Sequence, residues 1–436
     1  MRHWLQHIRQ HAFWRSVITL LSGSALAQGL NLLLLPLLAD LYDTTAFGVQ
    51  AVFMALVQTV AIAANGGYDQ AIMLPEASAE AHALFRLSQG LALGVALLVS
   101  LGLVAADPWL WRLMEVEDLG GWQWLLPLSL WLESSMQPLR IMLNRLGAYR
   151  TLALSKLLRA LVAGGLMLGL GWAEVGFAGL LIGWSAGLLT AWLALMVAYL
   201  LALHRHPVPR QALRQVAWAY RDFPLKSVGS SFLNNFSRQL PFYLLPAFFG
   251  QTVNGYYFMA YRALMLPMSL VSGAIGEVFY RQAALRKAQG AAAVAALLRR
   301  TALQLAGLGA LPLVLLMAIG PWLAVVALGP EWEPAGVYVR WLMPWVFLTF
   351  VASPLTSLTD IYRRLEAELT YNVLLLLARG GTLLLGGYWL GAQQTVIGYA
   401  VVGSLMMGGY LWFLFHLIQQ EQRREGQLLA SPPFQP

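Results

Sequence analysis

The chain has 436 residues, of which 59% are hydrophobic and only 11% are charged, and it contains 17 Trp and no Cys. Soluble domains carry about 25% charged residues, so this composition excludes a soluble globular protein. The absence of Cys excludes disulfides, thiol nucleophiles and Cys-bound metal centres. The formal charge is +8, but the basic residues lie in separate short loops rather than on one polar face. We therefore expect no nucleic-acid partner.

Twelve windows of mainly apolar residues follow one another along the chain, and each is long enough for a membrane-spanning helix, which needs about 20 residues. Their continuous runs of Leu, Ala, Val and Gly lack the alternation of transmembrane β-strands. The windows are 16–39, 46–66, 86–106, 122–140, 151–170, 176–201, 224–246, 252–273, 301–320, 336–357, 371–390 and 395–418. The sequence thus predicts an all-α integral membrane protein with twelve transmembrane helices.

The basic residues alternate between the two sides of the membrane that these windows define. If the N-terminus is cytoplasmic, 22 of the 28 Lys and Arg residues fall in cytoplasmic tails, loops or the cytoplasmic ends of spans, one (Arg112) falls in an outer loop, and five lie further inside spans. Because cytoplasmic loops carry an excess of Lys and Arg, this pattern predicts that both termini are cytoplasmic.

The second half of the chain repeats features of the first. Leu35-Pro36 near the end of the first predicted span is followed 210 residues later by Leu245-Pro246 in the seventh, and a glycine follows each, Gly48 and Gly255. This spacing predicts two pseudo-symmetric six-helix lobes, 1–205 and 206–436, as in transporters that bind substrate between two repeated halves. Chance similarity is the alternative, because Leu, Pro and Gly matches arise easily.

Polar side chains form a stripe on the seventh predicted span. Ser231, Asn234 and Arg238 recur at helical spacing and share one face. In the first span Gln28 occupies the position of Arg238 at the 210-residue offset, and Asn31 lies one turn further. Lipid does not tolerate such a face, so we expect these residues to line one cavity and to bind substrate.

Further arginines lie within the spans. Arg262 is near the middle of the eighth span and, like Arg238, is too deep to reach the interface, so we expect it in the same cavity. Arg159 and Arg379 lie about eight residues, or roughly 12 Å, inside their spans; a cavity site and an interfacial position are both open for them. Arg340 is shallow, which favours the interface. Planar guanidinium groups suit phosphate or diphosphate oxygens.

Two acidic residues lie in or next to the spans. Glu133 is at mid-span, and Asp69 closes the second span. A carboxyl in a low-dielectric environment has a raised pKa unless a cation pairs with it. Each residue is therefore a candidate either for carrying a coupling ion, H+ or Na+, or for acting as the counter-ion of a cavity arginine.

Residues 277–300 lie between the eighth and ninth spans and mix Ala and Leu with five basic residues. This composition predicts an amphipathic helix on the anionic inner leaflet. The chain has no phosphate-cradling Gly-rich loop, no HExxH zinc motif and no nucleophile elbow. We expect no enzyme activity, no catalytic residue, no metal and no cofactor.

Three segments resemble those of a known family, the Wzx-type polysaccharide flippases. The run from Leu41 to Gly48, LYDTTAFG, resembles that family's "LY-x-x-x-x-FG" signature. The run from Gly67 to Pro75 is similar to its "RYE-x-AI-x-LP" segment, with Gly67 and Asp69 in place of the Arg and Glu. Residues 223–284 are similar to the core of its second half, and the resemblance covers nearly the whole chain.

This resemblance implies the MATE-like fold of the multidrug/oligosaccharidyl-lipid/polysaccharide exporters, in which two lobes alternate between inward-facing and outward-facing states. It implies an undecaprenyl-diphosphate-linked oligosaccharide as substrate, moved across the bacterial inner membrane for synthesis of O-antigen lipopolysaccharide, capsule or exopolysaccharide. The implied partners are membrane lipids and a polysaccharide polymerase with its chain-length machinery. We expect a monomer.

Other functions remain open. A multidrug exporter of the same fold would favour an acidic cavity for its organic cations, whereas the deep charges here are mainly Arg. A membrane-embedded polysaccharide polymerase or ligase would carry a large outer loop, but the longest one here, about 107–121, has a single Arg and no His. A scaffold without transport activity is the third alternative.

Overall fold

The computed structural model describes residues 23–105, 117–202, 210–224, 228–362 and 364–430, and all regular elements in these ranges are helices. Ten of the helices are long and apolar enough to cross a membrane, so this is a multi-pass membrane protein. Features predicted within 1–22, and Arg112, lie outside the described residues.

The described helices form two compact units that divide between Phe258 and Met259, within α10 (Val228–Lys287). This division is later than the predicted lobe boundary at 205, because residues 228–249 of α10 pack with the first unit: Asn235 and Gln239 both donate to Gln58. Gly250 has a non-helical backbone (φ 83°, ψ 168°) and breaks α10 into two helical segments.

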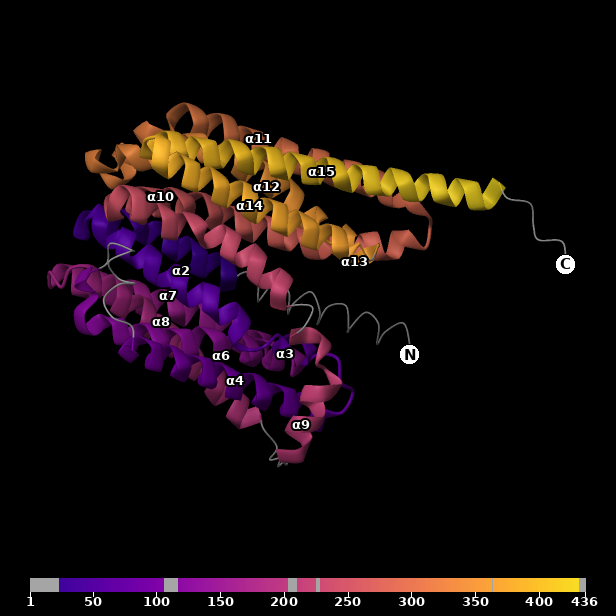
Figure 1. Cartoon of the computed structure of the whole chain (residues 1–436), viewed down its shortest axis with the longest axis horizontal. Helices are drawn as coiled ribbons and strands as arrows, with labels where there is room; N and C mark the ends of the chain where they lie inside the picture. Colours follow the sequence, from indigo (N-terminus) through magenta and orange to yellow (C-terminus); the bar gives the residue numbers. More distant parts are fainter. Residues whose placement is uncertain (1–22, 106–116, 203–209, 225–227, 363, 431–436) are drawn as a thin grey trace. The chain divides into compact units, whose positions relative to one another are not determined.

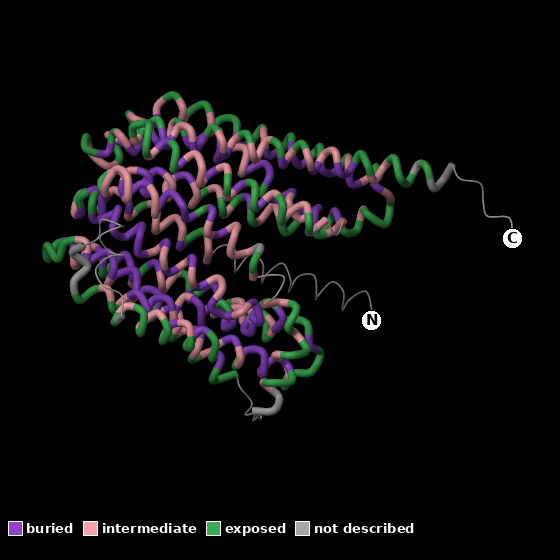
Figure 2. Tube along the Cα trace, in the orientation of Figure 1, coloured by how far each residue is buried: buried purple, intermediate pink, exposed green. Residues whose placement is uncertain are grey.

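The first unit contains the first nine described helical elements and the beginning of α10 (Figure 1). They are the first helix (Gly23–Leu41), α2 (Thr44–Ala64), α3 (Tyr68–Ala71), α4 (Ser78–Ala105), η1 (Glu117–Trp124), α6 (Leu125–Arg145), α7 (Tyr149–Trp172), α8 (Phe177–Ala202) and α9 (Arg210–Ala219). Helix α7 packs along α8, and α6 packs between α4 and α8. Buried residues occupy the facing sides of these helices (Figure 2).

Residues of the LYDTTAFG run have packing roles at the start of α2. Asp43 caps the helix by accepting a 2.7 Å hydrogen bond from the backbone N–H of Ala46. Tyr42 is buried and donates to the carbonyl of Met167 at 2.6 Å, and the Phe47 ring is fully buried against it. The motif therefore fixes α2 against α7, which is a structural role.

Gly48 and Gly255, the two glycines aligned by the half-length repeat, contact each other's helices. A Cβ on Gly48 would overlap the carbonyl of Gln251, and one on Gly255 would overlap the carbonyl of Thr44. Asn254 donates to the Gly48 carbonyl at 2.8 Å. Small residues allow helix backbones to approach closely in membranes, and here they bring α2 against the second segment of α10.

The second unit contains the end of α10 and the remaining helices. They are α11 (Ala291–Leu328), η3 (Pro330–Trp332), α12 (Glu333–Ala352), η4 (Ser353–Leu355), α13 (Leu358–Ile361), α14 (Leu365–Trp389) and α15 (Ala392–Ala430). Helix α12 packs against α11 and α15, and α14 packs along α15.

The predicted single amphipathic helix over 277–300 is wrong. Helix α10 continues to Lys287, α11 begins at Ala291, and Gly290 turns the chain between them with φ 102°. Although Val278 and Leu285 are exposed, other apolar residues of the segment, such as Phe279 and Leu298, are buried in a hydrophobic cluster shared with α12 and α15. They are therefore covered by protein, and the ends of two long helices replace the surface helix.

Candidate functional site

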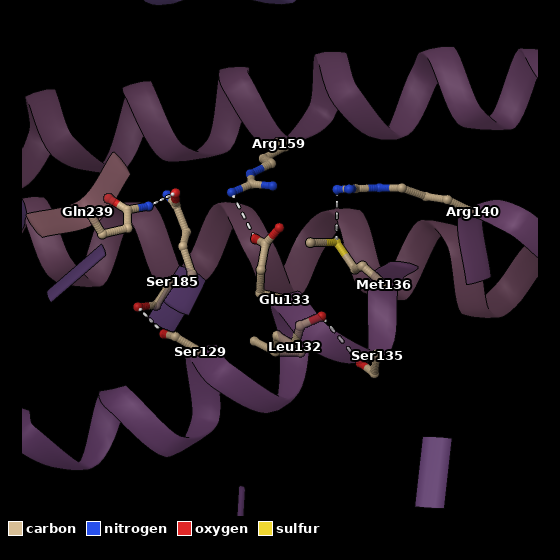
Figure 3. A network of polar contacts seen from close by, with 10 residues as sticks. Ser129, Leu132, Glu133, Ser135, Met136, Arg140, Arg159, Ser185 and Gln239 are labelled. Atoms are coloured by element: carbon tan, nitrogen blue, oxygen red, sulfur yellow. Dashed lines mark hydrogen bonds and ion pairs between the residues drawn. The ribbon is translucent and has the colours of Figure 1, made fainter. Parts of the chain in front are cut away.

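An ion pair links α6 and α7 inside the first unit (Figure 3). Arg159 Nη2 donates to Glu133 Oε2 at 3.2 Å, and the side chains are only 27% and 21% exposed. The Arg159 guanidinium also lies over the ring of Trp184, 5.9 Å from its centroid. Glu133 thus pairs with an arginine, as expected if it acts as a counter-ion. Its other expected role, in carrying a coupling ion, remains a prediction.

A second arginine lies near the same carboxylate. Arg140 is two helical turns after Glu133 on α6, and its guanidinium extends back along the helix toward this pair (Figure 3). It interacts electrostatically with both Glu133 and Arg159, and its hydrogen bond is a weak one to the Met136 sulfur at 3.8 Å. Two guanidinium groups therefore face one carboxylate, which leaves a surplus positive charge inside the unit.

Arg140 is the last residue of the predicted span 122–140 and was counted among the cytoplasmic basic residues, so it was not expected to belong to a site. The signal that could have found it is its seven-residue spacing from Glu133, which places both side chains on one face of a helix. Helix α6 extends to Arg145, five residues beyond the predicted span, so Arg140 lies within the helix.

Amide groups join α2 and α10 beside this charged group. Gln239 Nε2 donates to Gln58 Oε1 at 2.9 Å, and Asn235 Nδ2 donates to the Gln58 carbonyl at 3.0 Å. The Tyr243 and Thr59 hydroxyls, 2.7 Å apart, extend the contact along the same helices.

The predicted stripe lies on a different face of α10 from Asn235 and Gln239. Ser231 and Asn234 are half-buried, and Arg238 is exposed. Gln28 and Asn31 of the first helix are also half-buried. Their shared cavity and their role in substrate binding remain predictions.

The second unit holds a buried arginine. Arg379 on α14 is only 2% exposed, and its guanidinium lies over Trp345 at 5.0 Å and over Tyr399 at 5.3 Å from the ring centroids. Its Nε has no hydrogen-bond partner among the described residues. The interfacial alternative is therefore wrong for Arg379, because its head group is enclosed by protein.

The aromatic residues around Arg379 are held by their own packing. Gly403 faces the Trp345 indole, and a Cβ there would lie 2.9 Å from the ring, so glycine leaves room for the indole. Tyr261 stacks on the same indole with centroids 6.5 Å apart. The adjacent Arg262 is half-buried, and its role in substrate binding remains a prediction.

Asp69 lies at the start of the short helix α3, which follows Gly67 in a left-handed conformation (φ 70°). The side chain is buried, and this burial raises the pKa of the carboxyl, while hydrogen bonds from the backbone N–H groups of Asp69 and Gln70 lower it by less. Arg145 holds the following loop by donating to the carbonyls of Ile72 and Glu76 at 3.0 and 3.3 Å. A raised pKa suits a proton carrier, but that role remains a prediction.

Arg340 donates to two backbone carbonyls of α11, and one of them is left without its helical partner by a proline. Pro321 has no N–H, so it cannot donate to the carbonyl of Met317 four residues earlier in α11. Arg340 Nε donates to that carbonyl at 2.8 Å, and its Nη2 donates to the Ala318 carbonyl at 3.1 Å. The guanidinium is therefore bound to a neighbouring helix, and the interfacial position favoured by the sequence does not account for it.

We expect Arg340→Gln to lower the free energy of unfolding by about 1.5–3 kcal/mol, the range for loss of charge-assisted hydrogen bonds. In a Pro321→Ala background the same change should cost less than half as much, because the substituted residue donates its own N–H to the Met317 carbonyl. Thermal unfolding in detergent of the four proteins in this double-mutant cycle measures the coupling. An equal loss of unfolding free energy in both backgrounds would show that Arg340 does not compensate for the missing N–H of Pro321.

The profile of a family described as polysaccharide biosynthesis protein matches residues 37–336, more than half of the chain. This chain belongs to the polysaccharide biosynthesis protein family. The result confirms the resemblance drawn from the sequence motifs. No curated protein matches the chain.

Solved structures share the fold of this family member. An inward-facing multidrug resistance MATE family transporter of the MOP superfamily is 14% identical, with 92% of this chain and 96% of that chain covered and a TM-score of 0.70. The lipid II flippase MurJ, in an inward closed conformation, is 11% identical, with 97% and 93% covered and a TM-score of 0.67. A MOP superfamily transporter from Pyrococcus furiosus is 14% identical, with 94% and 95% covered and a TM-score of 0.61. These matches confirm the MATE-like fold.

Proposed function

We propose that this protein is a flippase that moves an undecaprenyl-diphosphate-linked oligosaccharide from the cytoplasmic to the outer leaflet of the bacterial inner membrane. Family membership and the fold shared with a lipid II flippase support a transporter of this kind. The observation that carries the proposal is the surplus of enclosed guanidinium groups: Arg140 and Arg159 share one carboxylate, and Arg379 lies over two aromatic rings. Such groups favour the oxygens of a diphosphate.

The same surplus argues against a multidrug exporter. A multidrug exporter would need anionic groups to hold organic cations, and a polymerase or ligase would need catalytic groups at the outer surface. Accordingly, loss of the protein should interrupt polysaccharide export without changing resistance to cationic drugs.

We further propose twelve spans with both termini cytoplasmic. Ten helices meet a hydropathy criterion, but α10 contains two spans because it breaks at Gly250. Helix α6 has 21 residues, about 31 Å at 1.5 Å per residue, and its charged residues reduce its hydropathy. In this topology two six-helix lobes alternate access to a cationic cavity lined by Arg238 and Arg262, with Asp69 or Glu133 coupling the movement to H+ or Na+.

We expect Arg238→Ala and Arg262→Ala each to reduce glycan export about tenfold or more, because a lost charge-assisted contact to a phosphate costs about 1.5–3 kcal/mol. Surface polymer and protein level are measured together in cells that depend on each variant. Arg423→Ala, at an exposed arginine near the end of α15, is the matched control. Normal polymer in both cavity variants would remove these residues from the substrate site.

A further inference from the structure

Helix α9 is a short amphipathic helix between α8 and α10, and the proposed transport cycle gives it no role. One face packs on the first unit, with Val216 buried and Leu213 and Tyr220 half-buried. The opposite face exposes Arg214 and Trp218, one helical turn apart.

Arg221 adds a second charge to this exposed face. It follows in the turn after α9, and its guanidinium lies over the Trp218 ring, 5.4 Å from the centroid. Trp218 is nevertheless 62% exposed. The large apolar ring of Trp218 thus lies on the exposed face together with the guanidinium groups of Arg214 and Arg221.

Contacts on the packed face fix the orientation of α9. The Tyr68 hydroxyl donates to the Ala217 carbonyl at 3.1 Å, and α9 packs against α4. Burial and the neighbouring Glu80 carboxylate, which accepts a hydrogen bond from the phenol, raise the pKa of Tyr220, so it stays a donor at neutral pH. Helix α9 lies beside α3 at one end of the first unit (Figure 1). The exposed face is therefore held in place by the fold.

We propose that α9 is an interfacial anchor that binds anionic phospholipid headgroups. Arg214 and Arg221 contact the phosphate groups, and Trp218 inserts at headgroup level, where indole rings are enriched in membrane proteins. Basic residues beside an apolar face are attracted to anionic lipid surfaces. Arginine forms bidentate, charge-assisted hydrogen bonds with phosphate oxygens. This binding goes beyond the proposed transport of a lipid-linked glycan and does not depend on it.

The absence of Cys from the chain makes a direct test possible. Ala219→Cys, at an exposed position next to Trp218, gives a unique site for an environment-sensitive nitrobenzoxadiazole label on the full chain. In detergent, the labelled protein is titrated with short-chain phosphatidylglycerol, short-chain phosphatidylcholine or inorganic phosphate. We expect the emission to shift to shorter wavelength with phosphatidylglycerol alone.

Charge variants of the labelled protein test the two arginines. Arg214→Gln and Arg221→Gln together should raise the phosphatidylglycerol midpoint about thirtyfold, because each basic residue near an anionic surface contributes roughly fivefold. Arg423→Gln is the control and should leave the midpoint unchanged. The melting temperatures should match, because all three side chains are exposed.

Equal responses to phosphatidylglycerol and phosphatidylcholine would overturn the proposal, as would an unchanged midpoint in the double variant. A shift with inorganic phosphate alone would identify a free-anion site instead of a lipid anchor. Glycan transport is not measured in this experiment, so its outcome is independent of the proposed function.

Discussion

Replacement of Arg379 with Met is expected to abolish glycan export and, at the same time, to raise the stability of the protein. Arg379 is 2% exposed, and the described structure gives its charge two aromatic faces but no carboxylate. Removing an enclosed charge in favour of an apolar group of similar length is often stabilising by about 1–4 kcal/mol. Because no carboxylate in the described structure compensates this charge, we expect a gain in the upper part of that range, about 3–4 kcal/mol. The lost cation–π contacts offset about 2 kcal/mol of it, which leaves a net increase of about 1–2 kcal/mol in the free energy of unfolding.

The expected loss of export has a separate cause. If Arg379 supplies donors to an anionic substrate during the transport cycle, Met supplies none. Export should fall at least tenfold while the protein level stays normal. Arg379→Lys keeps the charge but lacks the planar group that stacks on Trp345, so it should restore export only in part. Normal export by the Met variant, or a fall in its melting temperature, would assign Arg379 to packing.

Replacement of Glu133 with Gln is expected to destabilise the first unit more than replacement of its partner Arg159. The Gln variant leaves Arg140 and Arg159 without a carboxylate, whereas Arg159→Gln leaves Glu133 with Arg140 nearby. Breaking a fully buried pair costs about 3–5 kcal/mol. Because these side chains are about one quarter exposed, we expect about 2 kcal/mol for Glu133→Gln and less than half of that for Arg159→Gln.

Thermal unfolding of the purified variants measures this difference. Glu76→Gln is the matched control, because Glu76 is exposed and such surface changes usually stay within about 0.5 kcal/mol. The double variant Glu133→Gln/Arg159→Gln should be more stable than Glu133→Gln alone, since it removes one of the two uncompensated charges. A larger loss of unfolding free energy for Arg159→Gln than for Glu133→Gln would show that Arg140 does not share the Glu133 carboxylate.

Hydropathy was sufficient to predict the ten long apolar helices, because a membrane-spanning backbone must satisfy its own hydrogen bonds. It also drew attention to Glu133, Arg159 and Arg379, since charged residues within apolar windows are conspicuous. It did not show which of them pair. The rotation of α6 against α7, which brings Glu133 to Arg159, depends on packing between helices and is not encoded in the composition of either helix.

Shorter or less regular features were harder to predict. Helix α9 has ten residues, too few for a membrane span. The burial of Val216 determines which of its faces is exposed, and the sequence does not show that burial. Residues 277–300 have the composition of a surface helix, yet Phe279 and Leu298 pack inside the second unit. For residues 277–300 the sequence indicated an amphipathic pattern, but the partner of the apolar face was decided by tertiary packing.

A flipping measurement on the purified protein tests the central proposal most directly. The protein is reconstituted into liposomes that contain an undecaprenyl-diphosphate oligosaccharide with a fluorescent label on its sugar, and a membrane-impermeant reductant is added outside. Our account predicts that the reductant bleaches lipid from both leaflets when the wild-type protein is present, but only the outer-leaflet fraction in empty or Arg379→Met liposomes. Bleaching limited to the outer leaflet with the wild-type protein would contradict it.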